Sequence, residues 1–199
     1  MSDNIKQLTV LFQGKKERTF EQLDLIKEEP LSIRVQGRPY VVVMRTPGDE
    51  MAHVAGFCLA EGILDSPEDI GTIASCEGET TNVVTLTVTP ARLGAITHVL
   101  DRRGFVSQTA CGICGKVLVE DLSQMVRILP DGPAIDLEKA YQCLESLKGL
   151  QPLYQQTRTT HAAAIYTSAF ELLSVAEDVG RHNALDKAIG KLFLNGTLH

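Results

Sequence analysis

The sequence predicts a mixed α+β protein in two parts, residues 1–104 and residues 105–199, that meet near Gly104. Short runs typical of β-strands dominate the first part, around one strongly amphipathic helix. Helix and strand patterns are mixed in the second part. Because 44% of the 199 residues are hydrophobic, the chain can form one domain or two small ones that share an interface.

Four segments describe the start of the chain. Residues 6–13 alternate weakly between apolar and polar side chains and predict a first strand. Residues 14–29 are charged and aperiodic, which indicates a loop or an edge segment. Residues 31–35 and 40–44 predict two further strands, and the Gln36-Gly37-Arg38-Pro39 stretch between them predicts a hairpin turn.

The strongest helix of the first part is predicted at about residues 50–61. Asp49 is the expected N-cap, and Gly62 is the expected C-cap. Another short helix start is indicated at Ser66 and Pro67. The apolar side chains that share one face of the main helix are Met51, Val54, Ala55, Cys58 and Leu59.

Two strands, at residues 72–76 and 82–88, and a helix at about 91–101 complete the first part. We expect four side chains of this helix to point inward. They are Leu93, Ile96, Val99 and Leu100.

The second part begins with a predicted helix at residues 116–127 and continues with one at about 137–148, capped by Asp136. A strand pair is predicted at 162–166 and 171–176, before a last helix at about 182–194. The expected buried stripe of the helix at 137–148 is Leu137, Ala140, Tyr141, Leu144 and Leu147. The inward residues of the last helix are Leu185, Ala188, Ile189 and Leu192.

Charge and composition exclude several classes of function. A net charge of −6 and a pI near 5.4 argue against a broad nucleic-acid surface, which needs a basic face. The chain has no apolar run near the roughly 18 residues that span a bilayer. Its start lacks the basic-then-apolar order of a signal peptide. We therefore expect a cytoplasmic protein that binds neither nucleic acid nor membrane, and whose five cysteines stay reduced.

The Cys111-Gly112-Ile113-Cys114-Gly115 stretch is the first candidate site. A CxxC pair serves as half of a zinc site, as a redox couple or as a nucleophile with a partner thiol. Zinc is disfavoured because no second ligand pair exists and the other cysteines, at positions 58, 76 and 143, are scattered. A reactive thiol is favoured, since the stretch precedes a predicted helix and Lys116 adds positive charge.

The second candidate site is the polar stretch at residues 177–187, at a strand-to-helix junction. Such a junction presents free backbone N–H groups to an anion, and Arg181 and His182 would add charge there. The alternative is that Asp178 or Asn183 caps the helix while the charges are solvated. The Gly180-Arg181-His182 sequence favours contact with a phosphate or a nucleotide.

His161 lies in the third candidate site, just before an apolar strand. Composition alone leaves open whether it is a ligand, a base or a core histidine. The order His-Ala-Ala invites comparison with zinc deaminases, but Ala163 stands where their catalytic glutamate would be. The CxxC also comes first and lacks a preceding proline, so deaminase chemistry is disfavoured while a related fold stays open.

These three stretches, in this order, resemble the FdhD family, the formate dehydrogenase accessory sulfurtransferases. The similarity extends from about residue 28 to residue 191. Its N-terminal motifs are Glu29-Pro30-Leu31, the Gly37 turn, Met44-Arg45-Thr46-Pro47-Gly48-Asp49, Gly56-Phe57 and Glu61-Gly62-Ile63. Its later motifs are Cys111 to Gly115, Glu177 to Ala184, and Asp186-Lys187.

The resemblance implies a small N-terminal α+β domain followed by a cytidine-deaminase-like α/β domain without deaminase zinc. It implies a sulfur carrier that accepts sulfur as a persulfide from a cysteine desulfurase. The sulfur then passes to the molybdenum bis-molybdopterin guanine dinucleotide cofactor for formate dehydrogenase. Cys111 would carry the persulfide, with Cys114 as partner thiol. A homodimer is also implied, as is a further C-terminal part, including a cofactor-binding loop, beyond His199.

Contacts to the guanine dinucleotide are expected from the second and third stretches. The candidate cofactor-binding residues are Gly180, Arg181, His182, Asn183 and His161. Arg158 departs from the family pattern, which has glycine there. It would either add a phosphate contact or block the pocket. Two other functions stay open: a non-catalytic carrier of the molybdenum cofactor and a CxxC thiol oxidoreductase.

Overall fold

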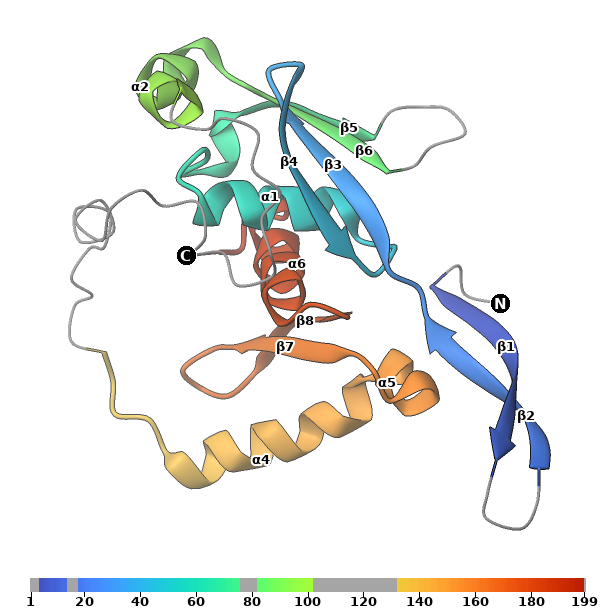
Figure 1. The fold of residues 1–199 in the computed structure, drawn as a ribbon. Coiled ribbons are helices and arrows are strands. Elements are labelled where there is room, and N and C mark those ends of the chain that lie inside the picture. Colours follow the sequence, from blue (N-terminus) through green and yellow to red (C-terminus); the bar gives the residue numbers. More distant parts are fainter. Residues whose placement is uncertain (1–3, 14–17, 76–81, 102–131, 199) are drawn as a thin grey trace.

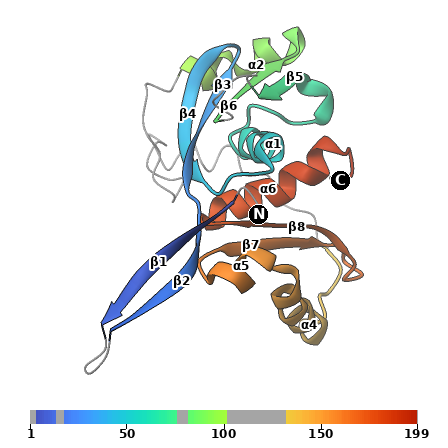
Figure 2. The same cartoon turned by 90° about the vertical axis from the view of Figure 1, so that its right-hand side faces the viewer.

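The structure, a computed structural model, describes residues 4–13, 18–75, 82–101 and 132–198. Its elements are arranged in layers (Figures 1 and 2): a four-stranded sheet, the helix α1, the helix α6, and a small sheet with two helices beneath it. The fold class is therefore mixed α+β, as expected. The predicted helix at 116–127 and the boundary at Gly104 lie outside the described residues.

The four-stranded sheet has the order β4-β3-β6-β5. Strands β3 (Glu29–Val35) and β6 (Val83–Val88) are parallel, while β4 (Arg38–Arg45) and β5 (Ile70–Ser75) pair antiparallel at the edges. Gln36 and Gly37 both have positive φ, at 52° and 75°, which produces the tight hairpin expected between β3 and β4. The sheet's inner face and α1 form the main hydrophobic core.

Helix α1 (Glu50–Ala60) is buried on almost every side, not along one stripe. All residues from Ala52 to Cys58 are buried, whereas Met51, predicted to face the core, is 47% exposed. The reason is that α1 is packed between the sheet on one side and α6 (Arg181–Leu194) on the other. A local helical pattern cannot reveal that a helix has two partners.

Two glycines let α1 and α6 approach each other closely. A Cβ atom on Gly56 would lie 2.0 Å from the carbonyl oxygen of Asp186, and one on Gly190 would lie 1.8 Å from that of Ala52. Ala188 and Leu192 of α6 are buried as predicted, but the small residues at this contact turn the buried face away from Leu185. Leu185 is 45% exposed. The buried residues are Ala184, Lys187, Ala188, Gly190, Leu192 and Phe193.

Two antiparallel strand pairs complete the set of sheets. Strands β7 (His161–Tyr166) and β8 (Leu172–Asp178) pair beneath α6, which confirms the predicted strand pair. Strand β1 (Ile5–Gln13) was also predicted. Its partner β2 (Arg18–Ile26) was not, because residues 14–29 have no clean period. The β1–β2 hairpin projects from the body as an arm (Figure 2).

The remaining elements are helical. They are η1 (Pro67–Asp69), α2 (Pro90–Asp101), α4 (Leu137–Leu147), η2 (Lys148–Leu150) and α5 (Pro152–Thr157), the last unpredicted. Asp136 caps α4 as expected, but the predicted buried stripe is wrong: Leu137, Tyr141 and Leu144 are 71%, 68% and 60% exposed. Leu93 of α2 is also 36% exposed. None of the described helices combines the length and apolarity needed to cross a membrane.

Candidate functional site

The second and third candidate stretches meet at one end of the β7–β8 pair. His161, the first residue of β7, lies directly opposite Asp178, the last residue of β8. The α6 helix starts three residues later, so the Gly180–Asn183 turn and His161 share this end of the ladder. The first candidate site, with Cys111 and Cys114, lies outside the described residues.

Asp178 is the organising side chain of this end, and it is fully buried. Its Oδ2 accepts a hydrogen bond from the Thr46 backbone N–H at 3.0 Å. Its Oδ1 accepts from the Gly180 N–H at 2.8 Å and from Asn183 Nδ2 at 2.9 Å. These three donors satisfy both oxygens of the buried carboxylate, which would be costly to bury without partners. Asp178 therefore ties the β8–α6 junction to the loop that follows β4.

Lys187 supplies the opposite charge and is only 1% exposed. Its Nζ lies 2.7 Å from Asp178 Oδ2 and donates to the Thr46 carbonyl oxygen at 2.7 Å. The Thr46 hydroxyl in turn accepts from the Val179 N–H at 3.0 Å. Taking both charges out of water is costly. The surrounding hydrogen bonds offset this cost, because they satisfy the carboxylate oxygens and the ammonium group that the ion pair alone would leave unpaired.

Asn183 and Gly180 have structural roles here. The Asn183 side chain donates to the Met44 carbonyl oxygen at 2.7 Å as well as to Asp178. A Cβ atom on Gly180 would lie 2.7 Å from Asn183 Nδ2, which explains glycine at the N-cap of α6. The hydrogen bonds of Gly180 and Asn183 to Asp178 and Met44 fix the position of the α6 N-terminus. Contact of these two residues with a cofactor stays a prediction.

Arg181 and His182 are exposed in the first turn of α6. The first intrahelical bond of α6 runs from the Ala184 N–H to the Gly180 carbonyl. The preceding N–H groups therefore belong to the helix N-terminus, where the macrodipole attracts anions. Exposed His161 lies at the same end of the ladder. The structure thus gathers all five predicted cofactor-binding residues in one region.

The loop before His161 is held by Glu177. The Glu177 carboxylate accepts from the Leu153 and Tyr154 N–H groups, both at 2.8 Å, and from the Thr160 hydroxyl at 2.9 Å. Arg158 ends α5 with a φ of 59°, and its guanidinium lies 5.5 Å from the Tyr154 ring centroid. A left-handed conformation favours glycine, so Arg158 occupies a backbone position that glycine would adopt with less strain.

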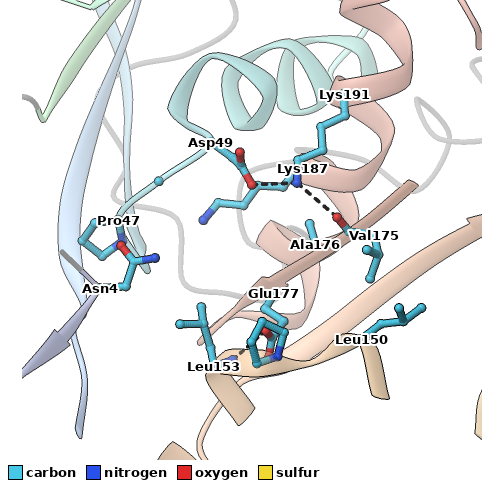
Figure 3. Close-up of a pocket in the computed structure, with 12 residues that line it drawn as sticks. Asn4, Pro47, Asp49, Leu150, Leu153, Val175, Ala176, Glu177, Lys187 and Lys191 are labelled. Atoms are coloured by element: carbon cyan, nitrogen blue, oxygen red, sulfur yellow. Dashed lines mark hydrogen bonds and ion pairs between the residues drawn. The ribbon is translucent and has the colours of Figure 1, made fainter. Parts of the chain in front are cut away.

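A pocket of about 360 Å³ opens between the loop after β4, α5, β8 and α6 (Figure 3). Lys191 Nζ lies 2.8 Å from Asp49 Oδ2 and donates to the Val175 carbonyl at 3.1 Å. Asp49 occupies the N-cap position of α1 as predicted, but its side chain makes no capping hydrogen bond to the helix. Among the described residues that line this pocket are Glu177 and Lys187, but none of the five predicted cofactor-binding residues.

Sequence reasoning missed two buried residues beside this site. His53 is fully buried on α1, and both of its ring nitrogens lack a hydrogen-bond partner among the described residues. Burial, and then the charge of Lys187, lower the pKa of His53 to about 4, so its imidazole is neutral at pH 7. Arg45 is also fully buried, and its guanidinium binds Asn82 at 2.8 Å and Glu50 at 3.1 Å.

His53 carried no sequence signal, because it lies within a run that reads as an ordinary helix, and Arg45 was noted only as part of the motif from Met44 to Asp49. Cys58 was predicted to be a core residue. It is completely buried, and burial raises the pKa of its thiol. Within the part of the chain that the structure describes, no three His, Cys, Asp or Glu side chains form a group that could hold a metal ion.

A comparison with models of known protein families shows which family this chain belongs to. The FdhD/NarQ family model matches residues 26–199. The chain belongs to the FdhD/NarQ family. The resemblance noted from the sequence is thereby confirmed.

Curated relatives agree with this assignment. The sulfur carrier protein FdhD of Streptomyces avermitilis is 35% identical over 183 residues, which cover 87% of this chain and 64% of the relative. The sulfur carrier protein FdhD of Mycobacterium tuberculosis is 39% identical over 180 residues, or 85% of this chain and 64% of the relative. The chain therefore spans a little under two thirds of the length of these relatives.

A solved structure shows the same fold. The crystal structure of a formate dehydrogenase accessory protein from Desulfotalea psychrophila matches with a TM-score of 0.73 at 19% sequence identity. The match covers 96% of this chain and 70% of that one. At this identity the likeness establishes the arrangement of elements alone.

Proposed function

We propose that this protein is a sulfur carrier that accepts sulfur on Cys111 and delivers it to the molybdenum bis-molybdopterin guanine dinucleotide cofactor for formate dehydrogenase. The observation that supports it most directly is membership of the FdhD/NarQ family, whose curated members named above are sulfur carrier proteins. The sequence keeps the CxxC stretch that such chemistry needs. A cysteine desulfurase, formate dehydrogenase and a second copy of the chain are the proposed protein partners.

The proposed loading step is a thiol–persulfide exchange. The Cys111 thiolate attacks the terminal sulfur of a persulfide on the cysteine desulfurase, and a new S–S bond forms on Cys111. The S–S bond on the desulfurase breaks, and its cysteine leaves as a thiolate. No electrons are gained or lost overall. Cys114 is the partner thiol in this proposal, and Lys116 favours the attacking thiolate.

The proposed nucleotide contact uses the α6 N-terminus. Exposed Arg181 and His182 would approach the phosphates, and His161 lies at the same end of the ladder. Gly180 and Asn183 would contribute by fixing the position of the α6 N-terminus, through the Gly180 backbone and the Asn183 side chain. The buried Asp178–Lys187 pair supports this role indirectly, because it holds the helix end in place.

Sulfur loading tests the proposal. The protein is incubated with cysteine and a cysteine desulfurase, and the Cys111 peptide is analysed by mass spectrometry for an added sulfur atom. We expect the adduct in the wild type and in Cys143→Ala, a matched control at a half-exposed cysteine, but not in Cys111→Ala. No adduct, or an adduct that survives Cys111→Ala, contradicts the proposal. A stable Cys111–Cys114 disulfide without sulfur loading would instead indicate a thiol oxidoreductase.

Nucleotide binding is tested separately. Titration calorimetry with GDP should show binding that weakens about tenfold in Arg181→Ala, since one charge-assisted phosphate contact is lost. Arg38→Ala changes an exposed arginine at the start of β4 and should leave binding unchanged. Binding that survives Cys111→Ala while sulfur loading is absent in the wild type favours the non-catalytic carrier. Equal GDP affinity in both arginine variants contradicts the placement of the phosphate at α6.

A further inference from the structure

The pocket beside α6 has no role in the proposed sulfur transfer or nucleotide contact. Its volume is about 360 Å³, and the five candidate cofactor-binding residues lie outside its lining. Asp49 and Lys191 lie on one side of it, opposite Leu150 and Leu153 (Figure 3). An apolar wall with a few polar groups is the usual form of a small-molecule site. The apolar lining residues are Pro47, Leu150, Pro152, Leu153, Val175 and Ala176.

The charges that line this pocket are balanced. Two carboxylates, of Asp49 and Glu177, face two ammonium groups, of Lys187 and Lys191. Lys187 is already paired with buried Asp178 at 2.7 Å. The Glu177 oxygens accept three hydrogen bonds from α5 and the loop before β7. The Asp49–Lys191 pair therefore remains as the charge that a ligand would meet.

Both members of this pair keep hydrogen-bonding capacity. Lys191 Nζ contacts Asp49 Oδ2 and the Val175 carbonyl oxygen, which leaves one of its three N–H groups. Within the described part of the chain, Asp49 Oδ1 and the side chain of Asn4, which also lines the pocket, have no hydrogen-bond partner. The Lys191 and Asp49 side chains are 34% and 48% exposed, so a ligand can reach both.

The backbone of Asp49 is strained. Its φ of 57° and ψ of 29° place it in the left-handed region, which is unfavourable for a residue with a Cβ atom. At the N-cap of α1 its carboxylate could also accept a helix N–H, yet it binds Lys191 instead. Backbone strain of this kind clusters at binding and catalytic sites. The strain and the unused capping bond therefore both point to a role for the Asp49 carboxylate in the pocket.

The paired charges select the class of ligand. A phosphate would bind Lys191 but would be repelled by Asp49 and Glu177, and a simple amine would be repelled by Lys191. An α-amino acid carries an ammonium and a carboxylate group on one carbon, so it matches both charges at once. Its ammonium group would donate to Asp49 Oδ1, and its carboxylate would accept from Lys191 and from the Asn4 side-chain amide.

We propose that this pocket binds a free α-amino acid, with an aliphatic side chain against the apolar wall. The volume of about 360 Å³ accommodates a ligand of this size. This site is independent of the sulfur-transfer proposal, because it uses neither Cys111 nor the α6 N-terminus.

Titration calorimetry of the whole chain with L-leucine gives the first test. We expect saturable binding with a Kd below about 1 mM. Two analogues keep the side chain but lack one charge: 4-methylpentanoate has no ammonium group, and 3-methylbutylamine has no carboxylate. Each should bind at least about tenfold more weakly, because one charge-assisted contact is lost and one charge of the pair is left unmatched.

Substitutions give the second test. Lys191→Met and Asp49→Asn should each weaken L-leucine binding at least about tenfold. Asparagine keeps the shape of the side chain and tolerates the left-handed conformation, so Asp49→Asn removes mainly the charge. Lys148→Met and Asp65→Asn are the matched controls, since both residues lie outside the pocket lining and should leave binding unchanged. Circular dichroism establishes that each variant is folded.

Four outcomes overturn the inference. They are no saturable L-leucine binding up to about 10 mM, equal affinity for L-leucine and either analogue, unchanged binding in Lys191→Met and Asp49→Asn, and equal loss in the control variants. Weakening confined to the analogues and the two pocket variants supports it. GDP binding and sulfur loading on Cys111, measured on the same samples, report separately on the proposed function.

Discussion

Replacing Lys187 by methionine tests whether the buried ion pair with Asp178 holds the two halves of the chain together. Methionine fills nearly the same volume, so the change removes mainly the charge and its two contacts of 2.7 Å. Breaking a buried pair by removing one partner costs about 3–5 kcal/mol. Asp178 would keep three N–H donors, from Thr46, Gly180 and Asn183. We therefore expect the lower end, a loss of about 3 kcal/mol in unfolding free energy.

The converse variant, Asp178→Ala, should cost more, about 5 kcal/mol. It leaves the Lys187 ammonium with the Thr46 carbonyl and deprives the Thr46 and Gly180 N–H groups of their acceptor. Urea unfolding at pH 7, followed by circular dichroism, measures both. Lys148→Met is the control, because that lysine is 79% exposed and its ion pair is worth well under 1 kcal/mol. A Lys187→Met protein within about 1 kcal/mol of wild type would refute the reasoning.

Three further substitutions have expected outcomes that urea or thermal unfolding, followed by circular dichroism at the stated pH, checks. Gly190→Ala should lower the free energy of unfolding by at least about 2 kcal/mol, because its Cβ would lie 1.8 Å from the Ala52 carbonyl oxygen. The control Gly149→Ala meets no atom within 4 Å and should be nearly neutral. Equal effects of the two variants would contradict the close helix contact. Arg158→Gly should raise Tm by about 1–2 °C, since relief at a φ of 59° exceeds the lost ring contact, and a lowered Tm would contradict this. Burial, and then the charges of Glu61 and Asp178, raise the pKa of Asp186 from its usual 3.8 to about 7. The unfolded chain therefore loses this proton at lower pH than the folded protein does, so Asp186 lowers the free energy of unfolding as pH rises from about 4 to 7. Asp186→Asn should therefore stabilise the protein at pH 8 and have little effect near pH 4; a gain that does not depend on pH would argue against this shift.

Local pattern was sufficient for most elements of the fold. Alternation and β-branched composition located β3, β4 and the β7–β8 pair, and turn chemistry located the hairpin at Gln36 and Gly37. These features depend on interactions between residues that are close in the sequence, so the local sequence is enough to predict them. The second strand of the arm was missed, because both of its faces are partly solvated and its alternation is therefore weak.

The packing of the helices could not be derived in the same way. Helix α4 has a clear apolar periodicity, yet Leu137, Tyr141 and Leu144 are exposed, because a pattern shows which residues could be buried and not what covers them. The α1–α6 contact joins Gly56 to Asp186 and Gly190 to Ala52 across more than a hundred positions. No periodicity within either helix encodes that approach.

The candidate site shows the same division. The sequence by itself determined the candidate residues, namely a CxxC pair, a polar strand-to-helix junction and a histidine before an apolar strand, and it determined the resemblance to the family that the comparison confirms. Only the tertiary structure decided that Asp178, Asn183 and Lys187 of that junction turn inward to bind the loop at Thr46, while Arg181 and His182 stay exposed. The physical reason is that a charged side chain is buried only where a partner from a distant segment compensates its desolvation, and local sequence does not contain that partner.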